Sequence, residues 1–358
     1  MSWQENLRDV EPYVSGEQPK LPNIIKLNTN ENPYPPTPKV KEVLQNFDAE
    51  KLRLYPNADA EGLQDAIATR YGLSKNQVFI GNGSDEVLAL SFLSFFNSQK
   101  PLLFPDLSYS FYPVYADLYG IPYEKVPVAE DFSLNLSDYT KGNAGGIIFP
   151  NPNAPTGLLV GLDFIESVLV HNPDCIVMID EAYVDFGGVT AIPLLAKYDN
   201  LVITRTFSKS RSLAGIRLGV ALGSQVAIKK LDDVKNSFNS YSVDAFAQAV
   251  GFASLSDESY FKKMCTKVIA TRNQFAQDLQ ALGFTVTDSR TNFVFAKVPK
   301  NVSAQNLFDA LYAQSIVVRH WPNNERIKEW LRITIGTDAE MAKFIAFLKE
   351  YIDGQSTI

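Results

Sequence analysis

The chain has 358 residues, a length that favours two domains or one large α/β unit, and its 46% hydrophobic and 20% charged residues are typical of a globular protein. A formal net charge of −7 without a basic stripe argues against nucleic acid and anionic membranes as partners. The two cysteines (Cys175, Cys265) and two histidines (His171, His320) argue against a disulfide framework, a metal site or a His-relay hydrolase, and indicate a reducing cytoplasm.

The N-terminal segment has neither the basic region nor the apolar region of a signal peptide. Residues 19–38 are rich in Pro and Asn without periodicity, so they predict an extended arm that leads into the main body. The longest nearly apolar stretch, Leu88 to Phe96, is about half of the ~20 residues that cross a bilayer. It predicts a buried helix and not a membrane span.

From about Gln77, short apolar runs closed by Gly, Pro, Asp or Asn alternate with helical patterns. This alternation is typical of a mostly parallel sheet that is covered by helices on both faces. Strands are predicted at Val78–Gly81, Leu102–Pro105, Gly146–Pro150, Ile176–Asp180, Leu201–Thr206 and Arg217–Leu222. Helices between them are predicted at Asp85–Asn97, Leu162–His171 and Thr190–Lys197.

After about Ser240 the pattern changes to that of a smaller α+β domain. Its helices are predicted at Ser259–Leu282, Ala304–Gln314 and Ala339–Ile352, and its strands at Phe284–Val286, Thr291–Val298, Ile316–Arg319 and Leu331–Ile335. The sequence therefore predicts an arm (1–26), a large domain (27–240) and a small C-terminal domain (241–358). Ligands of such sheets bind beyond the carboxyl ends of the strands, so the polar residues that close strands are the candidates for a site.

Asp180 closes the apolar run Cys175–Ile179, where a carboxylate is partly buried and needs a cationic or donor partner. One interpretation is a helix cap or an ion pair with an arginine. The other is a partner for a pyridinium nitrogen, because a buried anion keeps such a ring protonated and a good electron sink.

Lys209 follows a strand in Thr206-Phe207-Ser208-Lys209, and Arg217 comes eight positions later. Most lysines are solvated surface charges. At a strand end, however, a lysine with a lowered pKa can form a Schiff base and act as a base. Thr206, Ser208 and Arg217 would then hold a phosphate group.

Two turns add weaker signals. Gly81-Asn82-Gly83-Ser84-Asp85-Glu86 opens a helix whose free N–H groups suit a phosphate, although Ser84 or Asp85 could simply cap that helix. The turn matches neither the dinucleotide nor the ATP pattern. In Pro150–Gly157, Asn153 could donate to a phenolate oxygen or only shape the turn. Tyr109 could stack on a flat cofactor or only pack in a core or an interface.

Taken together and in this order, these motifs resemble the fold type I pyridoxal-phosphate aminotransferases over nearly the whole chain. The residues that carry the resemblance are Gly83-Ser84-Asp85, Tyr109, Asn153-Ala154-Pro155-Thr156-Gly157, Asp180-Glu181-Ala182-Tyr183, Ser208-Lys209 and Arg217. The resemblance implies a large domain with a mostly parallel seven-stranded sheet, a smaller α+β domain, pyridoxal 5′-phosphate as cofactor and a homodimer.

Within that group the chain resembles the histidinol-phosphate aminotransferases. This resemblance rests on Glu11-Pro12-Tyr13, Leu27–Pro33, Leu54-Tyr55-Pro56, and Arg319 thirteen residues before Arg332. It implies transamination of histidinol phosphate with 2-oxoglutarate in histidine biosynthesis. Alternatives are an aromatic amino acid aminotransferase, a related phospho-substrate lyase or decarboxylase, the sensor domain of a transcription regulator, and a purely structural protein.

The resemblance also implies a role for each matching residue. Lys209 would carry the cofactor, Asp180 would pair with its ring nitrogen, Tyr183 and Asn153 would bind its ring oxygen, and Tyr109 would stack on its ring. The cofactor phosphate would be bound by Ser84, Asp85, Thr206, Ser208, Arg217 and, from the other subunit, Tyr55. The substrate would face Tyr13, Asn153, Arg319 and Arg332. Residues 320–324 match no pattern, and we expect His320 to be a surface or packed histidine.

Overall fold

The computed structural model describes residues 2–355, and a seven-stranded sheet forms the centre of its larger lobe. The strand order is β2-β8-β7-β6-β5-β3-β4, and only β8 runs antiparallel to its neighbours. The strands are β2 (Val78–Gly81), β3 (Leu102–Pro105), β4 (Tyr123–Val126), β5 (Gly146–Pro150), β6 (Val177–Asp180), β7 (Leu201–Thr206) and β8 (Gly219–Gly223). The predicted mostly parallel sheet is confirmed.

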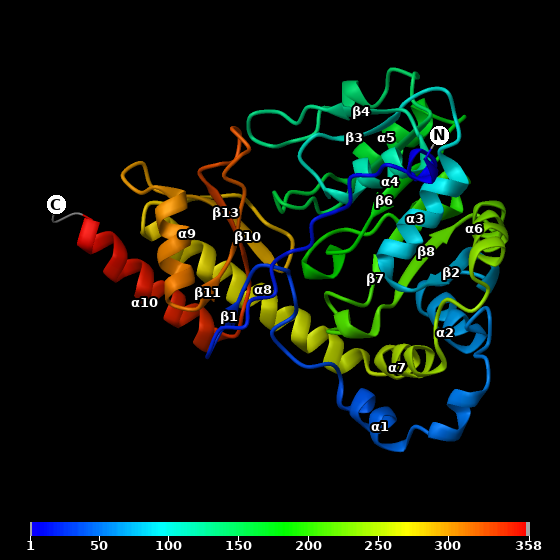
Figure 1. The fold of residues 1–358 in the computed structure, drawn as a ribbon, viewed down its shortest axis with the longest axis horizontal. Coiled ribbons are helices and arrows are strands. Elements are labelled where there is room, and N and C mark those ends of the chain that lie inside the picture. Colours follow the sequence, from blue (N-terminus) through cyan, green and yellow to red (C-terminus); the bar gives the residue numbers. More distant parts are fainter. Residues whose placement is uncertain (1, 356–358) are drawn as a thin grey trace.

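Helices cover both faces of this sheet (Figure 1). Side chains alternate along each strand, so that Ile147 and Ile179 join one core whereas Ile148 and Met178 join the core on the opposite face. The helices of this lobe are α1 (Pro38–Asn46), α2 (Glu61–Tyr71), α3 (Gly83–Phe95), α4 (Phe111–Tyr119), α5 (Leu162–His171), α6 (Gln225–Phe238) and α7 (Ala245–Leu255). The predicted buried helix at Leu88–Phe96 lies largely within α3.

The predicted helix Thr190–Lys197 is wrong in type, because this segment forms only a short 3-10 helix, Ile192–Ala196. Pro193 would be the fourth residue of the predicted helix, where its ring and its missing N–H disfavour an α-helix; in the shorter 3-10 helix it stands in the first turn, where no N–H is needed. Strand β4 was missed because it is an edge strand in which only Val126 is buried, so it lacks the apolar run that reveals the inner strands.

The smaller lobe consists of an antiparallel sheet, in the order β12-β13-β10-β9, packed against three helices. Its elements are α8 (Glu258–Ala281), β9 (Thr285–Val286), β10 (Phe293–Lys297), α9 (Ala304–Ala313), β12 (Arg319–His320), β13 (Trp330–Thr334) and α10 (Asp338–Gln355). The strand predicted at Ile316–Arg319 is divided. Its first half, β11 (Ile316–Val317), pairs in parallel with β1 (Ile25–Lys26) of the arm.

The arm therefore runs between the two lobes (Figure 1). Ile25 and Leu27 pack in the core of the smaller lobe, whereas α7 packs on α1 and α2 of the larger one. The predicted division at residues 26 and 240 stays a prediction. From this packing we propose that the larger lobe continues to about residue 257 and that the arm joins the smaller lobe.

No helix within residues 2–355 combines the length and the apolar character that a membrane span requires. In the same described part of the chain, no group of three or more His, Cys, Asp or Glu side chains is arranged to hold a metal ion.

Candidate active site

A cavity of about 240 Å³ lies where β5, β6 and β7 end and helix α3 begins; we call it the strand-end cavity. The topology explains its position, because parallel strands place their carboxyl ends at one edge of the sheet. Nine of the eleven residues predicted to bind the cofactor line it: Ser84, Asp85, Tyr109, Asp180, Tyr183, Thr206, Ser208, Lys209 and Arg217.

Asp180 contributes a buried carboxylate to this cavity, with 5% of the residue exposed. The Tyr112 hydroxyl donates to its Oδ2 atom over 3.1 Å, and the Ala182 amide donates to Oδ1 over 3.2 Å. Burial raises the pKa of Asp180 to about 6, although both hydrogen bonds favour the charged form and offset part of this rise. Within residues 2–355 no ion pair compensates this carboxylate, so a cationic ligand atom would be stabilised beside it.

Lys209 lies on the turn after β7 and reaches into the cavity. Its Nζ atom donates to the Thr29 carbonyl over 3.1 Å and lies 5.9 Å from the centre of the Tyr183 ring. The turn is held on both sides. Asn32 donates from Nδ2 to the Lys209 carbonyl over 3.1 Å, and the Ser210 hydroxyl donates to Asp185 over 2.6 Å. The amine is therefore positioned by its own loop and by the arm.

The predicted phosphate cradle lies where helix α3 meets the loop that ends in Arg217. Arg217 has φ +56°, in the left-handed region, and its Nη2 atom contacts the Asp85 carboxylate at 2.8 Å. Gly83 permits this approach, because a Cβ atom there would meet Nη2 of Arg217 at 2.5 Å. Tyr109 also donates to Asp85, over 2.9 Å. The carboxylate of Asp85 is thus already engaged, and only its backbone N–H can serve an anion.

The start of α3 excludes one of the two interpretations of its turn, in which Ser84 or Asp85 caps the helix. The helix begins at Gly83 with Asn82 as its N-cap, so neither Ser84 nor Asp85 is the capping residue. The Asn82 side chain makes no capping hydrogen bond and Glu86 accepts from the Asn82 amide, so the N–H groups of Gly83, Ser84 and Asp85 are left available. The hydroxyl-bearing Ser84, Thr206 and Ser208 line the cavity around this helix end.

Two predicted residues do not line this cavity. Asn153 is buried and donates from Nδ2 to the Leu107 carbonyl over 3.0 Å and to Thr156 over 2.9 Å, while its Oδ1 atom has no hydrogen-bond partner. Tyr55 is 82% exposed and stacks on Tyr241, with the ring centroids 4.6 Å apart. In a single chain, Tyr55 therefore lies on the surface.

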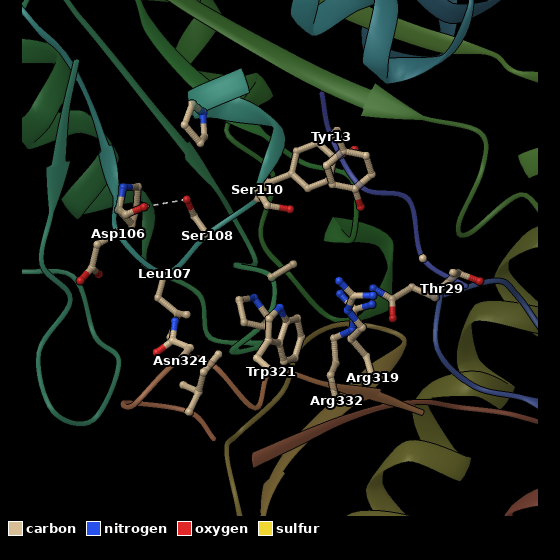
Figure 2. Close-up of a pocket in the computed structure, with 18 of the residues that line it drawn as sticks. Tyr13, Thr29, Asp106, Leu107, Ser108, Ser110, Arg319, Trp321, Asn324 and Arg332 are labelled. Carbon is tan, nitrogen blue, oxygen red and sulfur yellow. Dashed lines mark hydrogen bonds between the residues drawn. The ribbon is translucent and has the colours of Figure 1, made fainter. Parts of the chain in front are cut away.

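A second cavity, of about 370 Å³, adjoins the first and opens between the lobes; we call it the interlobe cavity (Figure 2). Lys209 and Tyr183 line both cavities. The three remaining predicted substrate residues, Tyr13, Arg319 and Arg332, line the interlobe cavity. The structure thus brings residues from the arm and from the smaller lobe to the lysine of the larger lobe.

Arg319 and Arg332 bring two positive charges to the interlobe cavity. Arg332 donates from Nη2 to the Asn28 carbonyl over 2.7 Å, and its buried Nε has no partner. Burial lowers the pKa of Arg332, and the charge of Arg319 lowers it further. Among the described residues neither arginine forms an ion pair with a carboxylate. Guanidinium groups with free donors favour a phosphate or carboxylate ligand.

Three residues of the extended segment 19–38, namely Thr29, Asn30 and Asn32, also contact the site, although the sequence motifs assign no role to them. Asn30 donates from Nδ2 to the Tyr183 hydroxyl over 2.8 Å and accepts from Thr334 over 3.0 Å. Asn32 and Thr29 contact Lys209, as described above. The signal for them is the run of polar residues 28–32 in an arm without periodicity, because such side chains need hydrogen-bond partners when they are buried.

The strand-end cavity has the chemistry that pyridoxal phosphate requires. It offers a lysine amine, an uncompensated buried carboxylate, an aromatic ring, and hydroxyl, guanidinium and helix N-terminal donors in one place. Asn153, next to the lining residue Ala154, stays outside that set, because its Nδ2 already donates to Leu107 and Thr156. The residues present therefore fit this cofactor.

Comparisons with known proteins agree with this geometry. The family model "Aminotransferase class I and II" matches residues 22–348. A histidinol-phosphate aminotransferase of Lactococcus lactis subsp. cremoris is 61% identical over 98% of this chain and 98% of its own length. One from Acinetobacter baylyi is 50% identical over 98% and 97% of the two chains. The crystal structure of a Sinorhizobium meliloti histidinol-phosphate aminotransferase in complex with pyridoxal-5′-phosphate has a TM-score of 0.84 at 24% identity and covers 92% of each chain.

Proposed function

The chain belongs to the class I and II aminotransferases, and we propose that it transfers the amino group of L-histidinol phosphate to 2-oxoglutarate in histidine biosynthesis, with pyridoxal 5′-phosphate as cofactor. Its relatives at 59–61% identity are histidinol-phosphate aminotransferases. The observation that carries the proposal is the position of Lys209. This residue lines both the strand-end cavity, which contains the buried carboxylate of Asp180, and the interlobe cavity, which contains Arg319 and Arg332.

The cofactor would be held by the residues of the strand-end cavity. Lys209 would bind its aldehyde carbon, and Asp180 would face its ring nitrogen. The α3 N-terminus, Ser84, Ser208 and Arg217 would bind the phosphate. Tyr183, whose hydroxyl accepts from Asn30, would donate to the ring oxygen. Asn153 would join it by exchanging one of the two acceptors, on Leu107 and Thr156, to which its Nδ2 now donates. When bound, pyridoxal phosphate supplies a protonated ring that withdraws electrons from the substrate α-carbon.

The Nζ atom of Lys209 would then move the proton. It would take the proton from the substrate α-carbon and return it during the same half-reaction, which is the work that a histidine performs in many other enzymes. The carboxylate of Asp180 would keep the facing ring nitrogen protonated throughout. Neither histidine of the chain lines either cavity, so the lysine is the base that the geometry supports.

Substrate recognition would rest on the interlobe cavity. Arg319 and Arg332 would bind the phosphate of histidinol phosphate in one half-reaction and a carboxylate of 2-oxoglutarate or glutamate in the other. Tyr13, which stacks on Phe111 at 4.0 Å between ring centroids, would close the side of the cavity formed by the arm. One pair of cations can serve both substrates because each carries an anionic group.

The test is turnover with defined amino donors. The loaded enzyme should convert histidinol phosphate with 2-oxoglutarate, and its kcat/KM should exceed that for phenylalanine by about 100-fold, because the unphosphorylated donor leaves the arginines unpaired. The Lys209→Ala variant serves as the control for adventitious turnover. Equal or faster turnover of phenylalanine would contradict the proposed substrate and favour the aromatic aminotransferase.

We also propose that the chain acts as a homodimer in which Tyr55 reaches the cofactor phosphate of the partner subunit. Support comes from an exposed apolar patch that contains this tyrosine and that a second copy would cover. Tyr55 stacks on Tyr241, and the exposed apolar side chains at or within three positions of this pair in the sequence, which we call the patch, are Leu52, Leu54, Tyr55, Phe238 and Tyr241.

Subunit mixing tests this arrangement. A hybrid of Lys209→Ala and Tyr55→Ala chains would have one intact site, so random mixing should restore about a quarter of the wild-type activity. Lys209→Ala mixed with Asp180→Asn should restore none, because both residues line the same cavity of one chain. Failure of the first mixture, despite dimers in light scattering, would place Tyr55 outside the partner's site.

We further propose a cytoplasmic location. Both cysteines are free in the structure, and burial raises the pKa of the Cys265 thiol to about 12, which keeps it unreactive. Fractionation of the native organism's cells would show enzyme activity with the cytoplasmic markers. Activity in a secreted or membrane fraction would contradict this location.

A further inference from the structure

Residues 320–324, which match no family pattern, divide into two parts in the structure. His320 lies outside both cavities: its Nε2 atom is 2.6 Å from the Lys328 carbonyl, and its ring packs beside Phe308. Trp321 lines the interlobe cavity beside the two arginines (Figure 2). The expectation of a packed histidine agrees with these contacts, and the neighbouring tryptophan is the residue that faces the site.

The arginines beside Trp321 form an unusual pair. Arg319 of β12 and Arg332 of β13 stand directly opposite each other in the antiparallel register. Like charges in such cross-strand positions destabilise a sheet. No carboxylate relieves the repulsion in an ion pair within residues 2–355, and the lowered pKa of Arg332 reflects both burial and the charge of Arg319. The protein must hold this pair by other means.

Trp321 supplies such a means. The guanidinium carbon of Arg319 lies 5.5 Å from the centre of its ring, and that of Arg332 lies 5.6 Å from it. Both distances are within the range of a cation–π interaction, for which tryptophan has the most favourable ring. The indole ring is itself fixed by an edge contact with Phe295, at 6.3 Å between centroids. An aromatic face attracts the cations without occupying the N–H donors that a substrate anion needs.

We propose that Trp321 is a positioning residue that holds Arg319 and Arg332 as an anion clamp and thereby selects substrates with a phosphate dianion over those with a carboxylate. A carboxylate side chain in its place would relieve the repulsion but would compete with the substrate. With the aromatic ring there instead, the site keeps two positive charges, and a dianion matches both. This inference rests on the proposed function, because it assigns the phosphate of that substrate to this clamp.

The experiment compares Trp321→Leu and Trp321→Phe with Trp330→Phe as the matched control. Trp330 belongs to the same apolar cluster but stacks on Phe295, at 4.7 Å, and not on the arginines. Trp321→Leu should raise the KM for histidinol phosphate about 5- to 30-fold, given the usual strength of cation–π contacts, with kcat changed less than about twofold. The KM for glutamate should rise less, Trp321→Phe should recover part of the loss, and Trp330→Phe should behave as wild type.

Binding of inorganic phosphate and of acetate to the loaded enzyme, measured by calorimetry, separates the clamp from turnover. If wild type does not transaminate histidinol phosphate but binds phosphate more tightly than Trp321→Leu does, the proposed function fails and the clamp stands. Equal losses for phosphate and acetate, equal KM changes for both substrates, or the same defect in Trp330→Phe would overturn the inference.

Discussion

The two adjoining cavities carry opposite uncompensated charge. The strand-end cavity has one buried carboxylate, Asp180, with hydrogen-bond donors but no cation in an ion pair. The interlobe cavity has two guanidinium groups, Arg319 and Arg332, neither of which forms an ion pair with a carboxylate of the described residues. Both arrangements cost free energy in the protein alone, since buried charge is destabilising unless it is paired. The signs therefore indicate what each cavity binds: a protonated ring in the first and an anionic substrate in the second.

The two cavities also differ in how the chain builds them. The first is formed mainly by residues that close strands of one sheet, and the second combines the arm, the larger lobe and two strands of the smaller lobe. A substitution at the first should therefore affect the cofactor and the chemical step. One at the second should affect the apparent affinity for substrate.

Lys209→Ala should reduce kcat by at least about 10⁴-fold, because it removes the amine that lines both cavities and would act as the base. Borohydride treatment of the loaded protein, followed by mass spectrometry of the peptide that contains position 209, should detect the cofactor adduct in wild type and not in the variant. Lys26→Ala, on the arm, should retain the adduct. An adduct on another lysine of the wild-type protein would refute the assignment.

Asp180→Asn should reduce kcat by about 10²- to 10³-fold and leave the KM for histidinol phosphate nearly unchanged, because a neutral amide does not keep the facing ring nitrogen protonated. Asp85→Asn provides a comparison in which the altered carboxylate contacts Arg217 and not the ring nitrogen. If the KM for histidinol phosphate rose by a factor as large as the fall in kcat, Asp180 would also affect substrate binding, and the two cavities would not have separate roles.

The same variant has a predicted effect on stability against pH. Burial raises the pKa of Asp180 to about 6, above the ~3.9 of an unfolded aspartate. The folded, cofactor-free protein therefore holds this proton more tightly than the unfolded chain, and wild-type stability should fall as the pH rises from ~4 to ~6. Asp180→Asn removes this contribution, so denaturant unfolding should show a smaller fall across that window. An identical pH dependence would contradict the raised pKa.

Arg332→Lys should raise the KM for histidinol phosphate by about 10- to 100-fold at nearly constant kcat, because lysine keeps the charge and loses the forked donor geometry. Steady-state kinetics with each substrate in turn would measure it. Arg290→Lys is the control, since Arg290 is paired with Asp288 near the surface. A fall in kcat without a change in KM would move Arg332 from substrate binding to the chemical step.

The sequence predicts the two cavities unequally well. β2, β3 and β5 were predicted to the residue because they contain almost only apolar residues, and Asp180 and Lys209 were found because they lie at or just after the end of a strand. The interlobe cavity depends on contacts between distant segments. Arg332 and Asn28, which share a hydrogen bond, are 304 residues apart, and Asn30 and Tyr183 are 153 apart. A local sequence motif cannot reveal contacts between residues so far apart in the chain. Arg332 was therefore assigned only from the family resemblance, and Asn30 was given no role.

Tyr112 was missed for the opposite reason: it is fully buried in helix α4 and looks like an ordinary core aromatic. Its hydroxyl nevertheless donates to Asp180 over 3.1 Å, and this bond lowers the carboxyl pKa against the effect of burial. Tyr112→Phe should therefore weaken the anion that faces the ring nitrogen. The position acts through Asp180 and touches neither cavity directly.

We expect Tyr112→Phe to lower kcat by about 5- to 10-fold, which corresponds to the net contribution of one ordinary hydrogen bond acting through Asp180. The acid limb of the kcat–pH profile should move to higher pH, because without the donor Asp180 becomes protonated more easily. Tyr115→Phe is the matched control on the same helix, since its hydroxyl donates to the backbone carbonyl of Asp85. If both variants shift the profile equally, the effect is one of helix packing, and the distinct role of Asp180 in the strand-end cavity would need another explanation.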